Sequence, residues 1–371
     1  MNIDAANLNY ADTKKREGYT KMDVEIKIPW YFDSREFYSY GFLKKINSIK
    51  DARVIFDFSE TKRIDPIIVP NFLFLGKILK DKTGQTPMIY LPDTVAAGYL
   101  KNYLDQIKFT SLAKSYGLYD FITDPYGGLE GKHIDPLCRT VYFDGNLTSD
   151  EIRFKIWHSI KPFSDKYLSN FEHFVTDESG NGDYRNAILD FIYEAVVNVR
   201  KYAQTAALVS FHSRYKDGTI NISISDIGKG FLESFKTKRR VVLKYDNGEV
   251  LTQEEQRLLS KMSQSQQEIV RRGEYLTECQ AIIEGSRWES ESRIYGLYNV
   301  IREVLEYRGW VRIHSNDTQV RFDEEIYGKF IKGELENSNI FLTENVRRYV
   351  PFEGVHIEIV IPMGERKYAD I

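Results

Sequence analysis

The chain has 371 residues, 42% of them hydrophobic and 28% charged, with a formal net charge of −3. This composition is typical of a folded globular protein, and the length indicates two domains. The near-neutral charge argues against nucleic acid or an anionic membrane as a partner. Cys138 and Cys279 are too few for a disulfide framework. Because no apolar run resembles a signal peptide or reaches membrane-spanning length, a cytoplasmic protein with no membrane partner is predicted.

The N-terminal part of the chain predicts alternating strands and helices. Residues 1–22 are polar, and we expect a flexible segment there. Strand patterns occur in VEIKIPWYF, ARVIFDFS and TPMIYLP, at 24–32, 52–59 and 86–92. Helical spacing follows each strand, beginning near Ser34, Pro66 and Thr94. This order predicts an α/β domain over residues 23–123.

The element order of this region resembles the STAS domain of anti-sigma-factor antagonists. That family often carries a phosphorylatable serine at the start of the helix that follows the central strand. Here the corresponding stretch, RIDPII, contains Asp65 and no serine. We therefore expect a STAS-like domain without a phosphorylation switch at that position.

Glycine and proline concentrate in residues 124–136, which predicts a linker. Beyond it, CRTVYFD predicts a strand, SDEIRFKIWHSIKPFSDKYL a helix, and a second helix is expected from about Tyr184. AALVSFHSRY and GTINISISD predict two strands joined by a hairpin turn. In the second strand, the residues Ile220, Ile222 and Ile224 alternate with Asn221, Ser223 and Ser225.

The helix containing LDFIYEAVVNVRKYA carries polar side chains in an otherwise apolar stretch. Asp190, Glu194, Asn198 and Lys201 recur at steps of three and four, so they share one stripe of the helix. Taken alone, this pattern is typical of an amphipathic helix with a solvated side.

The strand GTINISISD leads into SDIGKGF, so Asp226 leaves the sheet into a turn that contains Gly228 and Gly230. Glycines let a backbone approach a ligand closely. A carboxylate at the end of a strand can accept a hydrogen bond from a ligand amino group. The same pattern also describes an ordinary turn after a strand.

Two further glycines mark the C-terminal part of the chain. Gly285 is expected to break a helical stretch, and a new helix is expected to begin at Gly296, followed by Leu297. The free N–H groups of such a helix start can bind phosphate. A closing strand is predicted in EGVHIEIVIP.

Four patterns follow one another here: a helix with E-x-x-x-N, a strand ending in D-x-G-x-G, a glycine-marked helix start and a closing strand. In this order they resemble the GHKL superfamily of histidine-kinase-like ATPases, over residues 137–364 with a tail at 365–371. EAVVN is particularly similar to the anti-sigma-factor serine kinases, and NVRKYA to the N-box of sensor kinases. The resemblance implies an α/β (α+β) protein whose second domain is a Bergerat-type sandwich. Its sheet would be mixed and largely antiparallel, with helices on one face, and it would bind ATP and Mg²⁺.

The resemblance also implies residue roles. Asn198 would be the Mg²⁺ ligand, Glu194 would be the base that orients or deprotonates the nucleophile, and Asp226 would accept from the adenine amino group. The remaining residues implied to bind the nucleotide are Lys201, Tyr202, Gly228, Gly230, Gly285, Gly296 and Leu297.

Residues 231–284 form an insertion longer than compact members of the family need. It contains KTKRR, which predicts a solvated basic loop, a turn in YDNGEV, and a helix capped by Thr252 with Glu255 three residues later. We expect the insertion to pack beside the lid over the nucleotide, where it could bind a partner.

The sequence leaves three functional classes open. The first is a regulatory ATPase or protein serine/threonine kinase of the partner-switch type, which acts with a protein partner. The second is an ATP-gated dimer clamp, as in gyrase-like, MORC-like or heat-shock ATPases, and a homodimer is therefore left open. The third is an ATP sensor without turnover, favoured by a lid that retains only the last glycine of the family's G-x-G-x-G-L. No histidine lies in a dimerising helix like that of a sensor kinase, so autophosphorylation on histidine is not expected.

Overall fold

A computed structural model describes residues 23–92, 94–126, 138–161, 184–214, 218–260, 262–272, 276–287, 297–306, 308–331 and 346–362. It divides into two compact units, residues 1–142 with 208–213 and residues 143–207 with 214–371. Parallel and antiparallel strand pairs occur together with many helices, which confirms the predicted α/β class. The segment 127–137, which contains most of the predicted linker, lies outside the described residues, as do the predicted flexible N-terminus at 1–22 and the predicted tail at 365–371. Among the described helices, none combines the length and apolar character that crossing a bilayer requires.

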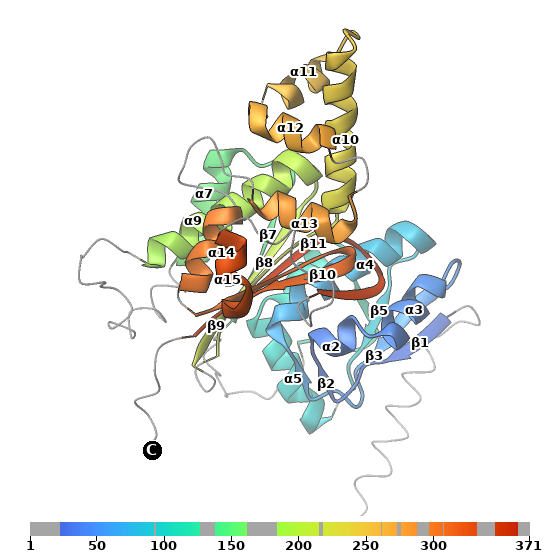
Figure 1. Ribbon diagram of the computed structural model, residues 1–371. Helices are drawn as coiled ribbons and strands as arrows, with labels where there is room; N and C mark the ends of the chain where they lie inside the picture. Colours follow the sequence, from blue (N-terminus) through green and yellow to red (C-terminus); the bar gives the residue numbers. More distant parts are fainter. Residues whose placement is uncertain are drawn as a thin grey trace, which may run out of the picture. The chain divides into compact units, whose positions relative to one another are not determined.

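The first unit contains a four-stranded sheet of order β1-β3-β5-β6, and every neighbouring pair is parallel (Figure 1). Parallel neighbours require crossover connections, and helices supply them here. The strands are β1 (Asp23–Lys27), β3 (Arg53–Asp57), β5 (Met88–Tyr90) and β6 (Asp120–Phe121). The longer helices are α3 (Tyr40–Ser48), α4 (Val69–Thr83), α5 (Val95–Gln106) and α6 (Phe109–Ser115). Shorter elements are β2 (Tyr31–Phe32), α2 (Ser34–Phe37), β4 (Arg63–Ile64) and the 3₁₀ turn η1 (Pro66–Ile68).

Asp65, in the stretch RIDPII, has a structural role. It is buried, its Oδ1 accepts a hydrogen bond from the Ile67 N–H at 3.2 Å, and its Oδ2 accepts one from the Tyr31 hydroxyl at 3.0 Å. The carboxylate thereby caps η1, where a helical turn leaves its first N–H groups without internal partners.

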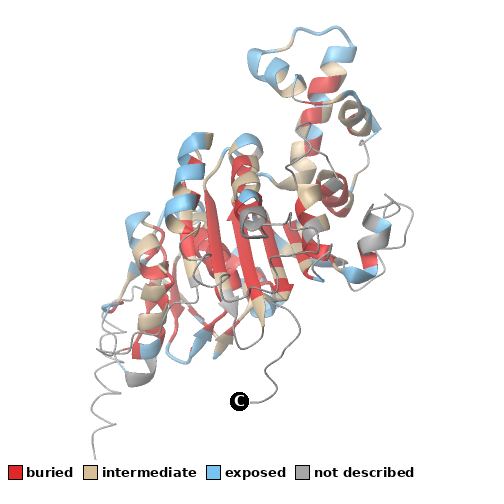
Figure 2. Ribbon diagram, turned by 90° about the vertical axis from the view of Figure 1, so that its left-hand side faces the viewer, coloured by how far each residue is buried: buried red, intermediate tan, exposed pale blue. Residues whose placement is uncertain are grey.

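The second sheet has five strands in the order β10-β11-β9-β8-β7. β10 pairs antiparallel with β11, and β11 pairs antiparallel with β9. The strands are β7 (Cys138–Phe143), β8 (Ala207–Arg214), β9 (Thr219–Asp226), β10 (Trp310–Phe322) and β11 (Val346–Pro362). In β9 the isoleucines alternate with polar residues as predicted, yet both sets are buried (Figure 2).

Helices pack on this sheet, with α9 against β9 and both α13 and α14 against β10 (Figure 1). The helices nearest the sheet are α7 (Ser149–Ser159), α9 (Tyr184–Asn198), α13 (Glu278–Arg287), α14 (Leu297–Glu306) and α15 (Glu324–Ile331). α10 (Gly230–Asp246), α11 (Gln253–Leu259) and α12 (Gln264–Arg272) project beyond the end of the sheet. These three helices correspond to most of the predicted insertion.

The projection shares a small core with α13, formed by Phe235, Val242, Met262 and Val270 together with Ala281 of α13. Paired charges reinforce it: Arg271 binds Asp246 through two hydrogen bonds of 2.8 and 2.9 Å. The predicted cap at the start of α11 is confirmed as a reciprocal pair between Thr252 and Glu255.

The prediction of a basic loop at KTKRR is wrong, because this stretch lies inside α10. Lysine and arginine favour helices, and apolar residues on both sides continue the helical spacing. Lys238 is buried within the projection, and burial lowers its pKa to about 7.

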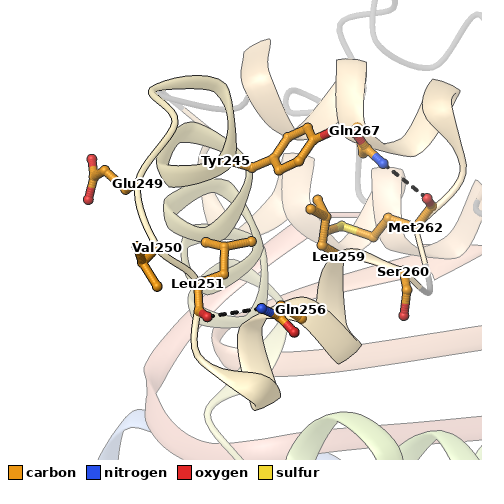
Figure 3. A pocket seen from close by; sticks show the side chains of 9 residues that line it. All are labelled: Tyr245, Glu249, Val250, Leu251, Gln256, Leu259, Ser260, Met262 and Gln267. Atoms are coloured by element: carbon orange, nitrogen blue, oxygen red, sulfur yellow. Dashed lines mark hydrogen bonds between the residues drawn. The ribbon is translucent and has the colours of Figure 1, made fainter.

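An open groove of about 580 Å³ lies near the tip of the projection (Figure 3). Its apolar lining includes Tyr245, Val250, Leu251, Leu259 and Met262. Two glutamine side chains donate hydrogen bonds along its walls, Gln256 to the Leu251 carbonyl and Gln267 to the Met262 carbonyl, each at 3.2 Å.

Candidate functional site

α9 carries Glu194 and Asn198, and it ends differently from the predicted continuous helix. After Asn198 the backbone turns into a π-helical segment, Val199–Ala203, and Gln204 then adopts a positive φ of 54°. A π-helical turn inside or after an α-helix is frequent at functional sites because it redirects the side chains that follow. Here it carries Ala203 toward the turn after β9.

Charged side chains surround Glu194, which is half-buried. Burial raises the pKa of Glu194 above its ordinary value, the positive charge of Lys201 lowers it, the negative charge of Asp190 raises it, and Arg153 lowers it. The structure therefore brings the predicted Glu194 and Lys201 into electrostatic contact. It adds Arg153 from α7, whose guanidinium lies 4.8 Å from the ring centroid of Tyr193 on α9.

Asp226 lies at the last position of β9 and is buried. Its Oδ1 accepts hydrogen bonds from the Gly228 N–H at 2.7 Å and from the Val355 N–H at 3.3 Å. Burial raises the pKa of Asp226 to about 6, against the lowering effect of these two donors. Both of these hydrogen bonds reach the same oxygen, Oδ1.

The contact between Gly228 and Ala203 joins the end of the π-helical segment to the turn after Asp226. A Cβ added to Gly228 would lie 2.5 Å from the Cβ of Ala203 and 3.1 Å from Asp226 Oδ1. No real Cβ approaches another atom so closely, which explains the glycine. Because Ala203 follows Asn198 and Lys201 by a few residues, this contact fixes the E-x-x-x-N helix next to the D-x-G turn.

Gly230 has a positive φ of 81° and starts α10. The N-terminus of α10 is satisfied from within the protein, because the Phe231 N–H donates to Ser315 Oγ at 3.0 Å and the Leu232 N–H to Glu278 Oε1 at 3.3 Å. Burial raises the pKa of Glu278. These two side chains come from distant segments, so no local sequence signal identified them.

The remaining predicted residues are distributed as follows. Gly285 lies within α13 and does not break the helix, which corrects the prediction; a Cβ there would lie 2.5 Å from the Phe231 ring. The glycine thus permits close packing of α13 on the start of α10. Leu297 is the first described residue of α14, which contacts α9. Gly296, the rest of the predicted lid and the side chain of Tyr202 lie outside the described residues.

Two arginines that the sequence analysis did not identify support this region. Arg153 lies near Glu194, and Arg200 donates to the Leu147 carbonyl at 2.9 Å and to Ser149 Oγ at 3.2 Å. Arg200 thereby ties the segment after α9 to the start of α7. Their positions depend on the packing of two helices, which periodicity along either one does not reveal.

Gly228→Ala is expected to reduce the free energy of unfolding by about 1–3 kcal/mol, because the new methyl group overlaps Ala203. Removing the opposing methyl group in Gly228→Ala/Ala203→Gly should restore part of the loss. We expect a favourable coupling of about 1–2 kcal/mol in a double-mutant cycle measured by urea denaturation. Strictly additive effects of the two substitutions would show that the helix end and the turn are not in contact.

No protein family, curated protein or solved structure matches this chain. Among the described residues, no three His, Cys, Asp or Glu side chains cluster as a protein-held transition metal would require.

Proposed function

We propose that the second unit binds Mg·ATP beside α9 and the Asp226 turn, as a GHKL-type regulatory ATPase or protein serine/threonine kinase of the partner-switch type. The observation that carries this proposal is the packing of Gly228 against Ala203. It supports a common site for Glu194, Asn198 and Asp226, which come from separate parts of the chain. If the polar residues of α9 only formed the solvated side of an amphipathic helix, α9 would not need a fixed position against this turn.

Asp226 has the properties that adenine recognition needs. The carboxylate is buried and oriented by two backbone N–H groups, so one oxygen is fixed and the other can accept from an exocyclic amino group. An acceptor of this kind selects adenine over guanine, whose corresponding position carries a carbonyl oxygen. Its pKa of about 6 keeps it ionised at neutral pH.

Glu194 has the properties of a general base. It is half-buried, and burial raises its pKa above that of an ordinary carboxylate, which strengthens it as a proton acceptor. Lys201 and Arg153 provide positive charge close to it. In this proposal, Glu194 accepts the proton of the attacking water or hydroxyl, and Lys201 offers positive charge to the phosphates.

The donor set also fits magnesium. Mg²⁺ prefers oxygen ligands and keeps several waters, so one amide oxygen from half-buried Asn198 together with phosphate oxygens is sufficient. When bound, the ion would neutralise the charge that develops on the phosphates. Such a site needs no cluster of protein carboxylates.

The first test is isothermal titration calorimetry of the full chain with ATP in the presence of Mg²⁺. We expect saturable binding at or below millimolar concentration, and weaker binding of Mg·GTP. The absence of heat and of saturation at millimolar Mg·ATP would count decisively against the proposal.

The fate of the γ-phosphate separates the three functional classes. Label transferred from γ-labelled ATP to protein would support a kinase, and release as free phosphate would support an ATPase or clamp. Binding with neither outcome would support a sensor, the class that the glycine-poor lid favours. A STAS-like first unit on the same chain favours a partner-switch regulator.

A further inference from the structure

Glu278, the first residue of α13, has a buried carboxylate that its own helix does not use as a cap. The start of α13 is capped by Thr277 instead. The Gln280 N–H donates to Thr277 Oγ1 at 3.3 Å, and the Thr277 N–H donates to Gln280 Oε1 at 2.8 Å. Within the described ranges, no lysine, arginine or histidine forms an ion pair with Glu278. Burying a carboxylate without an ion pair is unfavourable unless hydrogen bonds compensate, so the position of this side chain needs another explanation.

The Glu278 carboxylate holds the start of α10. Its Oε1 accepts a hydrogen bond from the Ser315 hydroxyl at 2.5 Å and another from the Leu232 N–H at 3.3 Å. Ser315 Oγ in turn accepts from the Phe231 N–H at 3.0 Å. Gly230 permits this approach, because a Cβ there would lie 2.7 Å from Ser315 Oγ. We call the two side chains the Glu278–Ser315 clamp.

The other end of the turn before α10 is held from the neighbouring strand. Ser315 of β10 is the register partner of Val355 of β11. The Val355 N–H donates to Asp226 Oδ1 at 3.3 Å. The turn from Asp226 to Gly230 is therefore fixed at its first residue by β11 and directly after its last residue by the clamp.

The clamp also joins the two ends of the projection. Leu232 lies at the beginning of α10, and Glu278 follows α12 at a separation of 46 residues. The start of a helix needs only some acceptor for its free N–H groups, and water or a nearby side chain can provide it. A buried carboxylate from a distant segment does more, because it also fixes where the helix begins.

We infer that Glu278 is a positioning residue of the nucleotide site, which acts through Ser315 to hold the turn from Asp226 to Gly230 in the conformation that accepts adenine. This inference rests on the proposed function. The hydrogen bonds of Glu278 go to Ser315 and to the backbone of α10, so its effect on the base passes through the turn. Without the clamp the turn would have to be ordered on binding, which weakens affinity.

Glu278→Ala removes both hydrogen bonds of Oε1. We expect it to raise the Kd for Mg·ATP about 5- to 30-fold in isothermal titration calorimetry of the full chain, and to reduce the preference for ATP over GTP. Glu278→Gln keeps an amide oxygen that can accept from the same two donors. Its Kd should stay within about threefold of the wild-type value.

Thr277→Ala is the matched control, because it removes the cap of the same helix at the adjacent, exposed position. It should lower the free energy of unfolding and leave the Kd for Mg·ATP unchanged. Urea denaturation and far-UV circular dichroism establish that each variant is folded under the conditions of the binding assay. An equal loss of affinity in Thr277→Ala and Glu278→Ala would overturn the inference, because a weakened α13 would then explain both. A Glu278→Gln variant that binds as weakly as Glu278→Ala would overturn it as well.

Ser315→Ala tests whether the clamp acts as one unit. It should weaken Mg·ATP binding by an amount similar to that of Glu278→Ala. The double variant should lose little more than the larger of the two single losses, because both substitutions break the same connection. Fully additive losses would show that Glu278 does not act through Ser315.

The wild-type chain separates this inference from the proposed function. If the wild type binds Mg·ATP and Glu278→Ala binds it equally well, the inference fails and the proposed site stands, with Asp226→Asn as the check on that site. If the wild type does not bind Mg·ATP, the proposed function and the inference both fail.

Discussion

Asp226→Asn is expected to weaken Mg·ATP binding by about 10- to 100-fold and to remove the preference for ATP over GTP. Both backbone donors, Gly228 N–H and Val355 N–H, reach Oδ1 in the present structure. The amide oxygen of the variant must therefore take that position, which leaves its NH₂ group where Oδ2 lies. A donor would then face the adenine amino group, and neither partner could accept.

The same substitution is expected to stabilise the free protein at neutral pH. The pKa of Asp226 is about 6 in the folded chain and 3.8 without its surroundings, so keeping the carboxylate ionised in its buried position costs about 3 kcal/mol. This cost is absent below pH 3.8, where the carboxyl is protonated in both the folded and the unfolded chain. It grows as pH rises toward 6 and stays constant above, where both states are ionised. Asparagine carries no charge, so the variant does not incur this cost.

Urea denaturation at pH 4, 5, 6 and 7 measures this effect as the difference between variant and wild type. The difference should be near zero at pH 4 and should favour the variant by up to about 3 kcal/mol at pH 7. Calorimetry on the same samples gives the binding loss. A variant that binds ATP like wild type, with its selectivity intact, would remove Asp226 from the nucleotide site.

Glu194→Ala is expected to lower turnover of the γ-phosphate by about 10²- to 10⁴-fold while Mg·ATP binding is retained. The glutamate is assigned to proton transfer and does not hold the nucleotide. Phosphate release or transfer, compared with calorimetric binding, separates the two effects. Turnover that persists in Glu194→Ala would show that another group is the base.

The pH dependence of turnover provides the matched control. Glu194 must be ionised to accept a proton, so the rate should fall as pH drops through its pKa, which burial places above the ordinary value. Asp190→Asn removes the negative charge that raises this pKa. In this variant the acidic limb should move to lower pH, with the plateau rate preserved. If the acidic limb does not move in Asp190→Asn, the group whose titration limits the rate is not Glu194.

Local patterns determined several features of this protein. The alternation in GTINISISD predicted β9 and the position of Asp226 at its end, and the spacing of Glu194 and Asn198 placed both on α9. The Thr252 cap was also correctly predicted. Each of these depends on residues within one turn or one strand, so the sequence itself contains the interaction.

Only the tertiary structure decided how these pieces meet. The Ala203–Gly228 contact and the capping of α10 by Ser315 and Glu278 join segments that are distant in sequence. The π-helical segment after Asn198 leads to the first of these contacts, because it ends at Ala203. Gly285 was predicted to break a helix, because glycine is a weak helix former. It lies inside α13 instead, since close packing on Phe231 requires the smallest residue there. The low helix propensity of a single glycine costs about 1 kcal/mol, and the packing of α13 against α10 contributes more than this.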